Sequence, residues 1–363
     1  MTHKDMFIWS RLWKWIESKA RVTSETIPFD VCVTALKAAA EPTRLRILLL
    51  LGHIGELNVK DLTLILGQSQ PRLSRHLKLL TEAGLVERFR EGSFAYFQAS
   101  DRSAVQRLLA KLVASVDGDD VMLVRDRDRA LALKREREAS AQAYFSRHAS
   151  DWDRIRTLHV ADSKVEAALL AAIEPDFDCD LMVDLGTGTG RMLDVFRSRY
   201  RRAIGFDVSH EMLAYARSRV SADGLTRAQV RHGDLYNVAL ADGAADLVVM
   251  HQVLHFLSDP KRALIEARRV LAPGGRLLIV DFAPHDFEEL REAQAHERLG
   301  FSHGQMSQWL GETGLRRLSA IDLLPPPGAG DKLTVTLWVA TPGVMRALVP
   351  SPMTIPRSIQ EAR

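Results

Sequence analysis

The chain has 363 residues, of which 46% are hydrophobic and 26% are charged, as in ordinary globular proteins. It contains no run of about 18 apolar residues, which excludes a membrane-spanning helix, and its two cysteines, Cys32 and Cys179, are too few for a disulfide framework or a zinc site. Residues 1–111 carry 17 Lys and Arg against 11 Asp and Glu, whereas the remainder is mildly acidic. The length predicts two domains, and the charge favours a polyanionic partner for the first.

The two ends of the chain differ in composition from its middle. Residues 1–30 hold Trp9, Trp13 and Trp15 among basic residues and lack the uninterrupted apolar core of a signal peptide. We expect a packing arm or a disordered extension, with a membrane-surface helix as the alternative, and a cytoplasmic protein without a membrane partner. The proline-containing tail 341–363 is expected to be disordered. Between the ends we predict a first domain over 31–118, a helical connector over 119–142 and a second domain over 143–340.

Three closely spaced helices and a hairpin are predicted in the first domain. Pro42 suits the first turn of a helix that should end at Gly52, and a second helix should run from about residue 58 to the C-capping Gly67. The third begins at the N-cap Ser69 and continues to residue 80, with leucines along one face. Strand-like segments at 86–90 and 94–98 flank a short turn. This order predicts a winged helix-turn-helix.

The third helix has the properties of a DNA-reading element. Its polar and basic side chains lie outside the leucine stripe, so they can face the major groove, and two arginines on the predicted hairpin can contact phosphates. The residues expected to bind DNA are Ser69, Gln70, Arg72, Ser74, Arg75, Lys78, Arg88 and Arg90. A helical bundle with an incidental basic face is the alternative, and the order of helix, turn and hairpin disfavours it.

Residues 31–118 resemble the ArsR family of winged-helix repressors in the segments 41–48 (EPTRLRIL), 69–80 (SQPRLSRHLKLL) and 83–86 (AGLV). The resemblance implies a homodimer on a partly palindromic operator, with dimer contacts from the helices that flank the reader. Metal-sensing members carry two cysteines where this chain has Asn58 and Lys60. A protonated Lys offers no lone pair, and a soft metal prefers sulfur. We therefore predict no metal there, and a packing or phosphate-facing role for His76.

The connector carries charges of both signs at helical spacing, which predicts a solvated helix. Beyond it, strand-like and helix-like segments alternate, as is typical of a doubly wound parallel sheet. We expect an α/β, Rossmann-like domain with a mostly parallel seven-stranded sheet and a closing antiparallel strand. The strands are predicted at 181–184, 202–207, 230–235, 245–250 and 277–281, with an antiparallel pair at 315–318 and 333–340.

The first of these strands leads into the most informative segment, in which Asp184 is followed by Gly186, Gly188 and Gly190. Glycines there permit positive φ and let a ligand lie against the backbone. A dinucleotide site would place a pyrophosphate at this turn, but Asp184 would repel it, and the spacing is G-x-G-x-G rather than G-x-G-x-x-G. Both features favour S-adenosylmethionine, which carries an ammonium and a sulfonium but no phosphate. Asp207, at the end of the next strand, can accept hydrogen bonds from both ribose hydroxyls.

Residues 143–340 resemble the class I S-adenosylmethionine-dependent methyltransferases, closest to the UbiE-like and arsenite-methyltransferase-like branch. The resemblance implies that the three glycines approach the methionine part of the donor and that Asp207 holds the ribose. It further implies that Met212, Asp234 and Leu235 contact the adenine, and that His251 lies beside the methionyl end. Segment 144–153 resembles the lid-forming helix of that branch, with simple packing as the alternative for its tryptophan.

Methyl transfer from a sulfonium requires a positioned nucleophile, and it requires a base only if the acceptor is protonated. His251 and His255 are the candidate catalytic bases, each with a structural role as the alternative. His285, His296 and His303 lie on segments that line the acceptor pocket in the branch that the chain resembles. Arsenite is disfavoured as an acceptor because this half holds a single cysteine, and DNA adenine is disfavoured because no Asn/Asp-Pro-Pro-Tyr segment follows the fourth strand.

Taken together, the residues favour a DNA-binding transcriptional regulator of the metalloregulator-like ArsR type, fused to an S-adenosylmethionine-dependent methyltransferase. Its expected partners are operator DNA and a small-molecule methyl acceptor. The alternative is a repressor whose methyltransferase-like domain senses S-adenosylmethionine or S-adenosylhomocysteine without turnover.

Overall fold

The computed structural model describes residues 27–91, 94–99, 111, 113, 115–152, 162–325 and 332–343. They form two compact units, whose boundary along the chain falls between Ser140 and Ala141, with the short stretch Asp286–Glu288 assigned to the first unit. The predicted arm 1–30 and tail 341–363 lie almost wholly outside the described residues. None of the described helices combines the length and apolar character needed to cross a lipid bilayer.

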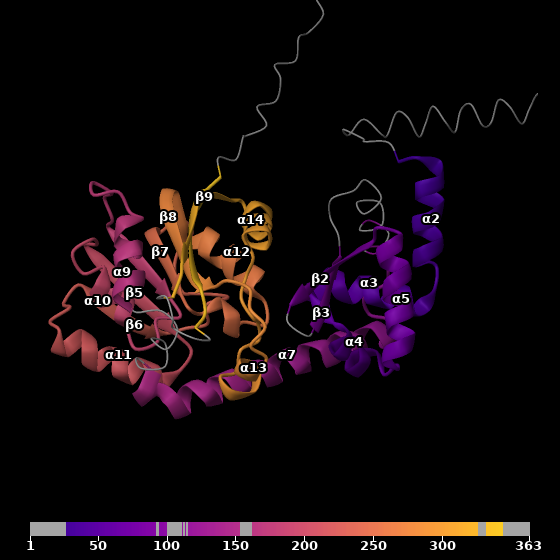
Figure 1. Cartoon of the computed structure of the whole chain (residues 1–363), viewed down its shortest axis with the longest axis horizontal. Helices are drawn as coiled ribbons and strands as arrows, with labels where there is room; N and C mark the ends of the chain where they lie inside the picture. The colour runs from indigo at the N-terminus through magenta and orange to yellow at the C-terminus, as the bar shows by residue number, and fades with distance from the viewer. Residues whose placement is uncertain are drawn as a thin grey trace, which may run out of the picture. The chain divides into compact units, whose positions relative to one another are not determined.

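The first unit has the predicted order of helices followed by a hairpin, and its small sheet is antiparallel with strand order β1-β3-β2. Figure 1 shows its helices in indigo to purple. The winged helix-turn-helix prediction is therefore confirmed. Its elements are α2 (Phe29–Ala39), α3 (Pro42–Ile54), β1 (Leu57–Asn58), α4 (Val59–Leu66), α5 (Gln70–Glu82), β2 (Val86–Glu91) and β3 (Phe94–Ala99).

Local chemistry explains where these helices begin and end. Asn58 and Asp61 form a capping box at the start of α4, in which each side chain binds the other residue's backbone N–H. Gly67 ends α4 in the left-handed conformation, as predicted. The prediction that Gly52 ends α3 is wrong, because the helix continues to Ile54 and Gly55, at φ +91°, supplies the termination. A glycine inside a helix costs only about 1 kcal/mol, which the packing of α3 outweighs.

Helix α7 (Val121–His148) differs from the solvated connector that its charges predict. It extends six residues beyond the predicted end at 142, and Ala130 is part of the buried core of the first unit. Asp126 is buried as well and forms an ion pair with Arg46. The mixed charges predicted a helix surrounded by water, but some of the charged side chains form ion pairs with residues distant in sequence.

The second unit is built on a seven-stranded sheet with order β6-β5-β4-β7-β8-β10-β9, in which only β10 runs antiparallel to its neighbours. This confirms the predicted Rossmann-like class. Its strands are β4 (Leu181–Leu185), β5 (Arg202–Asp207), β6 (Ala228–His232), β7 (Ala245–His251), β8 (Leu271–Phe282), β9 (Leu315–Leu323) and β10 (Val335–Pro342). Its main helices are α9 (Asp162–Ala171), α10 (Arg191–Val195), α11 (His210–Ala222), α12 (Pro260–Val270), α13 (Glu289–Ala293) and α14 (His303–Glu312).

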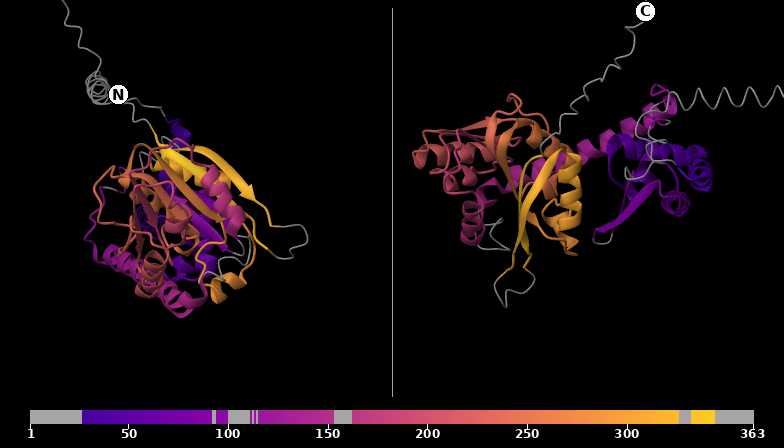
Figure 2. Two further views of the ribbon diagram at one scale, coloured as in Figure 1. Left: turned by 90° about the vertical axis from the view of Figure 1, so that its left-hand side faces the viewer. Right: turned by 90° about the horizontal axis from the view of Figure 1, so that it is seen from above.

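Helices cover both faces of this sheet. Figure 1 shows α10 and α11 on one side of the strands and α12 and α14 on the other, and Figure 2 shows the two yellow strands β9 and β10 paired side by side. The central strands are buried on both faces, as the burial of all five residues of β4 shows. Because β4, β5, β6 and β7 are parallel, their carboxyl ends share one edge of the sheet, where ligand sites of such folds form.

Candidate functional site

The glycine turn after β4 adopts a backbone that favours glycine. Gly186, Gly188 and Gly190 have φ of +76°, +52° and +80°, all in the left-handed region. The N–H groups of Gly186 and Thr187 both donate to the carbonyl oxygen of Phe206, each at 2.9 Å. The end of β5 therefore holds the start of the turn against the sheet.

Neighbouring side chains lie so close to this turn that a Cβ on one of its glycines would clash. A Cβ on Gly186 would lie 2.5 Å from Cγ2 of Val253, in the segment after β7. A Cβ on Gly188 would lie 3.5 Å from Nε1 of Trp152, so the tryptophan of the predicted lid segment lies over the turn. The peptide of this turn is thus bare, with an aromatic ring beside it.

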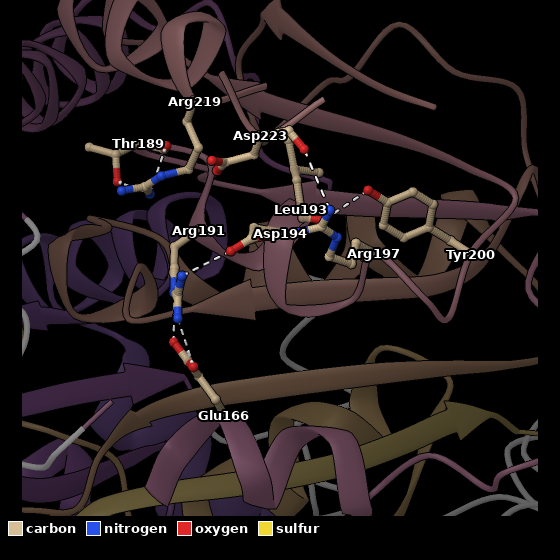
Figure 3. A network of polar contacts seen from close by, with 9 residues as sticks. All are labelled: Glu166, Thr189, Arg191, Leu193, Asp194, Arg197, Tyr200, Arg219 and Asp223. Carbon is tan, nitrogen blue, oxygen red and sulfur yellow. Dashed lines mark hydrogen bonds and ion pairs between the residues drawn. The ribbon is translucent and has the colours of Figure 1, made fainter. Parts of the chain in front are cut away.

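Polar contacts fix the far end of the turn and the helix that follows it. Arg219, from α11, donates to the carbonyl oxygen and to Oγ1 of Thr189, both at 3.1 Å. Arg191 binds both carboxylate oxygens of Glu166 at 2.7 and 2.9 Å, and Figure 3 shows these contacts around α10. The turn is therefore held in place by groups from α9 and α11 before any ligand arrives.

Asp184 is almost fully buried, and only one of its carboxylate oxygens is satisfied. Thr187 donates through Oγ1 to Oδ2 at 2.6 Å, whereas Oδ1 has no hydrogen-bond partner among the described residues. Burial raises the pKa of Asp184 to about 7, the hydrogen bond from Thr187 opposes this, and the negative charge of Asp207 adds to it. An unsatisfied buried carboxylate oxygen is costly, so this atom suits a cationic donor group of a ligand.

Asp207, the last residue of β5, is held in one orientation by two backbone N–H groups. Gly188 donates to Oδ2 at 2.8 Å and Ser209 to Oδ1 at 2.9 Å. Burial raises the pKa of this carboxyl, and the backbone hydrogen bonds oppose the rise. Each carboxylate oxygen keeps a further lone pair, so the group can still accept from two neighbouring hydroxyls. It is the second acid at this edge of the sheet.

The other residues expected to bind the donor fall at the same edge. Met212 is buried on the first turn of α11, and Asp234 and Leu235 lie two and three residues after the end of β6. Asp234 is exposed, and its Oδ1 accepts from the N–H of Tyr236 at 2.9 Å. His251 is the last residue of β7. The structure therefore brings the predicted donor residues to the carboxyl ends of four neighbouring strands.

The structure gives His255 a partner to which sequence reasoning had assigned no role. Nδ1 of His255 lies 2.7 Å from Oδ1 of Asp281, near the end of β8, and both residues are buried. The other oxygen, Oδ2, accepts from the N–H groups of Leu254 at 2.9 Å and His255 at 3.3 Å. A carboxylate against Nδ1 favours the tautomer with the proton on Nδ1, which leaves the lone pair on Nε2. The only sequence signal for Asp281 was an acid at a strand end.

An aromatic cluster connects this histidine to the glycine turn. The ring of Phe256 lies 3.9 Å from that of His255 and 4.6 Å from Phe145, between ring centroids. Trp152 lies 6.0 Å from Phe256 and extends to the glycine turn. The ring of His296 lies 4.3 Å from His255. The predicted lid segment, the segment after β7 and the loop before α14 thus meet at one place.

Two other histidines of the predicted acceptor pocket lie in different settings. His285 donates its backbone N–H to Leu299 at 3.0 Å and packs edge-on against Phe282, whose ring also stacks on that of His296. His303 is half exposed on α14, with Nε2 3.2 Å from Asp322. The histidines predicted to line the acceptor pocket therefore lie in two regions of the second unit.

All residues predicted to bind DNA present exposed side chains. Those on α5 and its N-cap are Ser69, Gln70, Arg72, Ser74, Arg75 and Lys78, and those on β2 are Arg88 and Arg90. The opposite face of α5 is buried through Leu73, Leu77 and Leu80. His76 is half buried, 3.5 Å from Oε2 of Glu41, and burial lowers its pKa. The helix thus keeps one apolar face in the core and offers a polar, basic face to a partner.

Comparisons with known proteins match the two halves separately. Residues 41–88 match the family described as "Bacterial regulatory protein, arsR family", and residues 183–279 match a "Methyltransferase domain". The arsenical resistance operon repressor of Escherichia coli (strain K12) is 46% identical over 72 residues, 20% of this chain and 62% of its own length.

Two methyltransferases are similar to the second half. The malonyl-[acyl-carrier protein] O-methyltransferase of Pectobacterium atrosepticum is 32% identical over 163 residues, 45% of this chain and 60% of its own. The demethylmenaquinone methyltransferase of Thermus thermophilus is 37% identical over 105 residues, 28% of this chain and 47% of its own. The chain therefore spans less than two thirds of the length of each of these relatives.

Proposed function

We propose that this chain, which joins an arsR-family regulatory domain to a methyltransferase domain, is a transcriptional regulator that binds operator DNA and transfers a methyl group from S-adenosylmethionine to a small-molecule acceptor. The observation that carries the proposal is the bare glycine turn with Asp184 and Asp207 beside it. Two carboxylates at this turn suit a cationic nucleoside and would repel a pyrophosphate. A DNA-binding regulator of this kind acts in the cytoplasm.

Each acid has a distinct role in holding the donor. Oδ1 of Asp184 lacks a hydrogen-bond partner among the described residues and would accept from the donor's ammonium. The oriented carboxylate of Asp207 would accept from the two ribose hydroxyls. The three glycines leave room for the methionine part, while Met212, Asp234 and Leu235 would contact the adenine. The donor supplies an activated methyl group on its sulfonium.

The acceptor would be bound beside the aromatic cluster and the buried dyad of His255 and Asp281. Phe256 and Trp152, whose rings lie 6.0 Å apart beside the glycine turn, would exclude water from that region. Nε2 of His255 carries the lone pair that could take a proton from a hydroxyl or acid acceptor as its oxygen attacks. His251, at the end of β7, is the second candidate base. An acceptor that is already a free nucleophile would need only the positioning.

The first unit would place α5 in the major groove of an operator. Its exposed Arg72, Arg75 and Lys78 supply positive charge, and the hairpin arginines would contact phosphates. Helix α2 exposes three apolar side chains, Phe29 at 85%, Val31 at 42% and Leu36 at 39%. Exposed apolar side chains grouped on one helix suit an interface, so we propose a homodimer formed through this unit.

A second candidate function is a repressor that senses S-adenosylmethionine or S-adenosylhomocysteine without turnover. The observation that favours it is α7, a single helix with residues in the core of the first unit, whose C-terminal part precedes the tryptophan at the glycine turn. Incubation with methyl-labelled donor and a broad panel of metabolites separates the two functions, because only the enzyme transfers the label.

Calorimetric titration of the full chain with S-adenosylmethionine tests donor binding. Asp207→Ala removes two charge-assisted hydrogen bonds to the ribose, so we expect the Kd to rise by about 100-fold or more. The matched control is Asp178→Ala, an exposed acid that pairs with Arg201 on the surface, and it should leave the Kd unchanged. If the wild-type chain takes up no donor, or if Asp207→Ala binds it as tightly, the proposed function fails.

A further inference from the structure

Helix α7 is attached to the core of the first unit by an ion pair near its N-terminal end. Both carboxylate oxygens of Asp126 accept from the guanidinium of Arg46 on α3, at 2.6 and 2.7 Å. The Asp126 side chain is 3% exposed and that of Arg46 16%. A bidentate pair of this kind fixes orientation as well as distance.

Two cations along the same helix bind the ends of the neighbouring helices. Arg129 donates to the carbonyl oxygen of Ile65 at 3.1 Å, near the end of α4, and Lys134 donates to that of Ile54 at 3.0 Å, at the end of α3. Cations are favoured at helix C-termini because the last carbonyl groups lack partners there. Asp126, Arg129 and Lys134 lie three and five residues apart in sequence, so one face of α7 is attached to the first unit over more than two turns.

The last of these contacts reaches the start of α4. Arg137 donates to both oxygens of Asp61, at 2.5 and 3.3 Å, and Asp61 is 1% exposed. The same carboxylate closes the capping box with Asn58. Helix α4 precedes the reader helix α5 and packs against it. A change at Arg137 would therefore act on the capped start of the helix that supports the reader.

The same helix continues past the boundary between the units and ends at the donor site. Phe145 packs edge-on against Phe256, and Ser146 donates to Glu211 on α11 at 2.9 Å. A few residues later Trp152 lies over Gly188. Residues 121–148 form one α-helix without interruption. One helix therefore carries both the contact with α4 and the start of the lid over the glycine turn.

We propose that α7 couples the occupancy of the donor site to the DNA affinity of α5, and that the Arg137–Asp61 ion pair is the contact through which it acts on the reader. The proposal rests on the proposed function, since it requires both donor and DNA binding. A donor that orders the lid favours one arrangement of the end of α7, and a continuous helix passes that preference to α4. Because the coupling is a free energy between two sites, DNA would change donor affinity by the same factor.

The test measures DNA affinity of the full chain with and without saturating S-adenosylhomocysteine, which binds the donor site without turnover. The probe is a fluorescent duplex selected from a random-sequence library by the chain itself, at one fixed salt concentration. For the wild type we expect a change of about fivefold or more in Kd between the two conditions. In Arg137→Gln this change should fall below about twofold, while each ligand alone still binds.

The matched control is Arg135→Gln, which makes the same change of charge at an exposed position on the same helix, and it should keep the wild-type response. If Arg137→Gln does not fold, a second variant decides: Ala139→Gly with Ser140→Gly weakens the helix at two exposed positions next to the boundary. It should bind both ligands without coupling them, unlike Ala139→Ser with Ser140→Ala. A wild type that binds both ligands without coupling, or coupling that persists in either test variant, overturns the proposal. Absence of donor binding instead refutes the proposed function.

Discussion

At the scale of single residues, burial makes the negative charge of Asp184 costly in the free protein. Its pKa of about 7 in the folded chain lies above its ordinary value of 3.8, because burial disfavours the carboxylate. Between pH 4 and 7 the folded chain therefore holds a proton that the unfolded chain has lost. The free energy of unfolding should fall as pH rises through this window, by at most about 4 kcal/mol in total.

Replacing Asp184 by Asn should remove this pH dependence. Urea unfolding at several pH values between 4 and 8, without donor, measures it: the wild type should lose stability relative to the variant as pH rises. Asp178→Asn, on the exposed surface, serves as the control and should follow the wild type. Parallel stability profiles for wild type and Asp184→Asn would show that the carboxyl ionises as easily in the folded state as in the unfolded one.

The dyad of His255 and Asp281 leads to a prediction about the rate of transfer. Asp281→Asn keeps the shape of the side chain but removes the negative charge that favours Nδ1–H and stabilises the protonated ring. For an acceptor that must lose a proton, we expect kcat to fall by about 10²- to 10⁴-fold, with the fall reduced at high pH where the acceptor ionises by itself. The Kd for S-adenosylmethionine should stay near that of the wild type.

Steady-state rates across a pH series check this, together with a calorimetric Kd for the donor. A purely structural role would lower the rate equally at every pH. That result, or a wild-type rate in the variant, would remove His255 from the set of candidate bases and leave His251.

At the scale of elements, α5 shows how one helix serves two demands. Leu73, Leu77 and Leu80 lie on one face of α5 and fill the core, and the exposed residues between them carry the positive charge. The same periodicity that the sequence displays therefore separates the structural face from the exposed face that we propose to contact DNA.

A charge change on the exposed face should alter binding without altering stability. Arg75→Ala should weaken DNA binding and, if Arg75 contacts a phosphate, reduce the slope of log Kd against log salt by about one. Fluorescence titrations from low to high salt measure the slope. Arg217→Ala, at an exposed position on α11 of the second unit, removes a charge of the same sign outside the predicted DNA-binding residues and should leave the slope unchanged. An unchanged slope and Kd in Arg75→Ala would place the DNA elsewhere on the molecule.

At the scale of the whole molecule, the chain joins two units, each with its own core, through a helix that takes part in both. The exposed apolar side chains of α2 belong to the first unit. If they form the dimer contact, the pairing of two reader helices depends on α2, and so does affinity for a palindromic operator.

Sedimentation velocity of the full chain should therefore give a mass twice that of one chain. Phe29→Asp combined with Leu36→Asp should shift the protein to monomer, because the two residues lie seven apart on one face of α2 and two charges would be buried at the contact. Val121→Asp, at an equally exposed apolar residue on α7, should leave the dimer intact. A monomeric wild type would rule out the proposed homodimer, and a dimeric double variant would place its interface elsewhere.

Much of the fold of this protein could be predicted from short-range patterns in its sequence. The capping residues of α4, the leucine stripe of α5 and the alternation of strands and helices depend on neighbours a few residues apart, and the winged-helix and Rossmann-like classes followed from them. The glycine turn with Asp184 and Asp207 was recognisable for the same reason. The roles assigned to individual site residues remain predictions.

Only the tertiary structure decided which distant groups meet. Arg46 and Asp126 are 80 residues apart, Arg137 and Asp61 are 76 apart, and His255 and Asp281 are 26 apart. Such pairs depend on how strands align and on which helix face is buried, and neither is encoded in the spacing of the two residues. For that reason the charges of α7 predicted a solvated helix, whereas the fold makes several of them the contacts that attach it to the first unit.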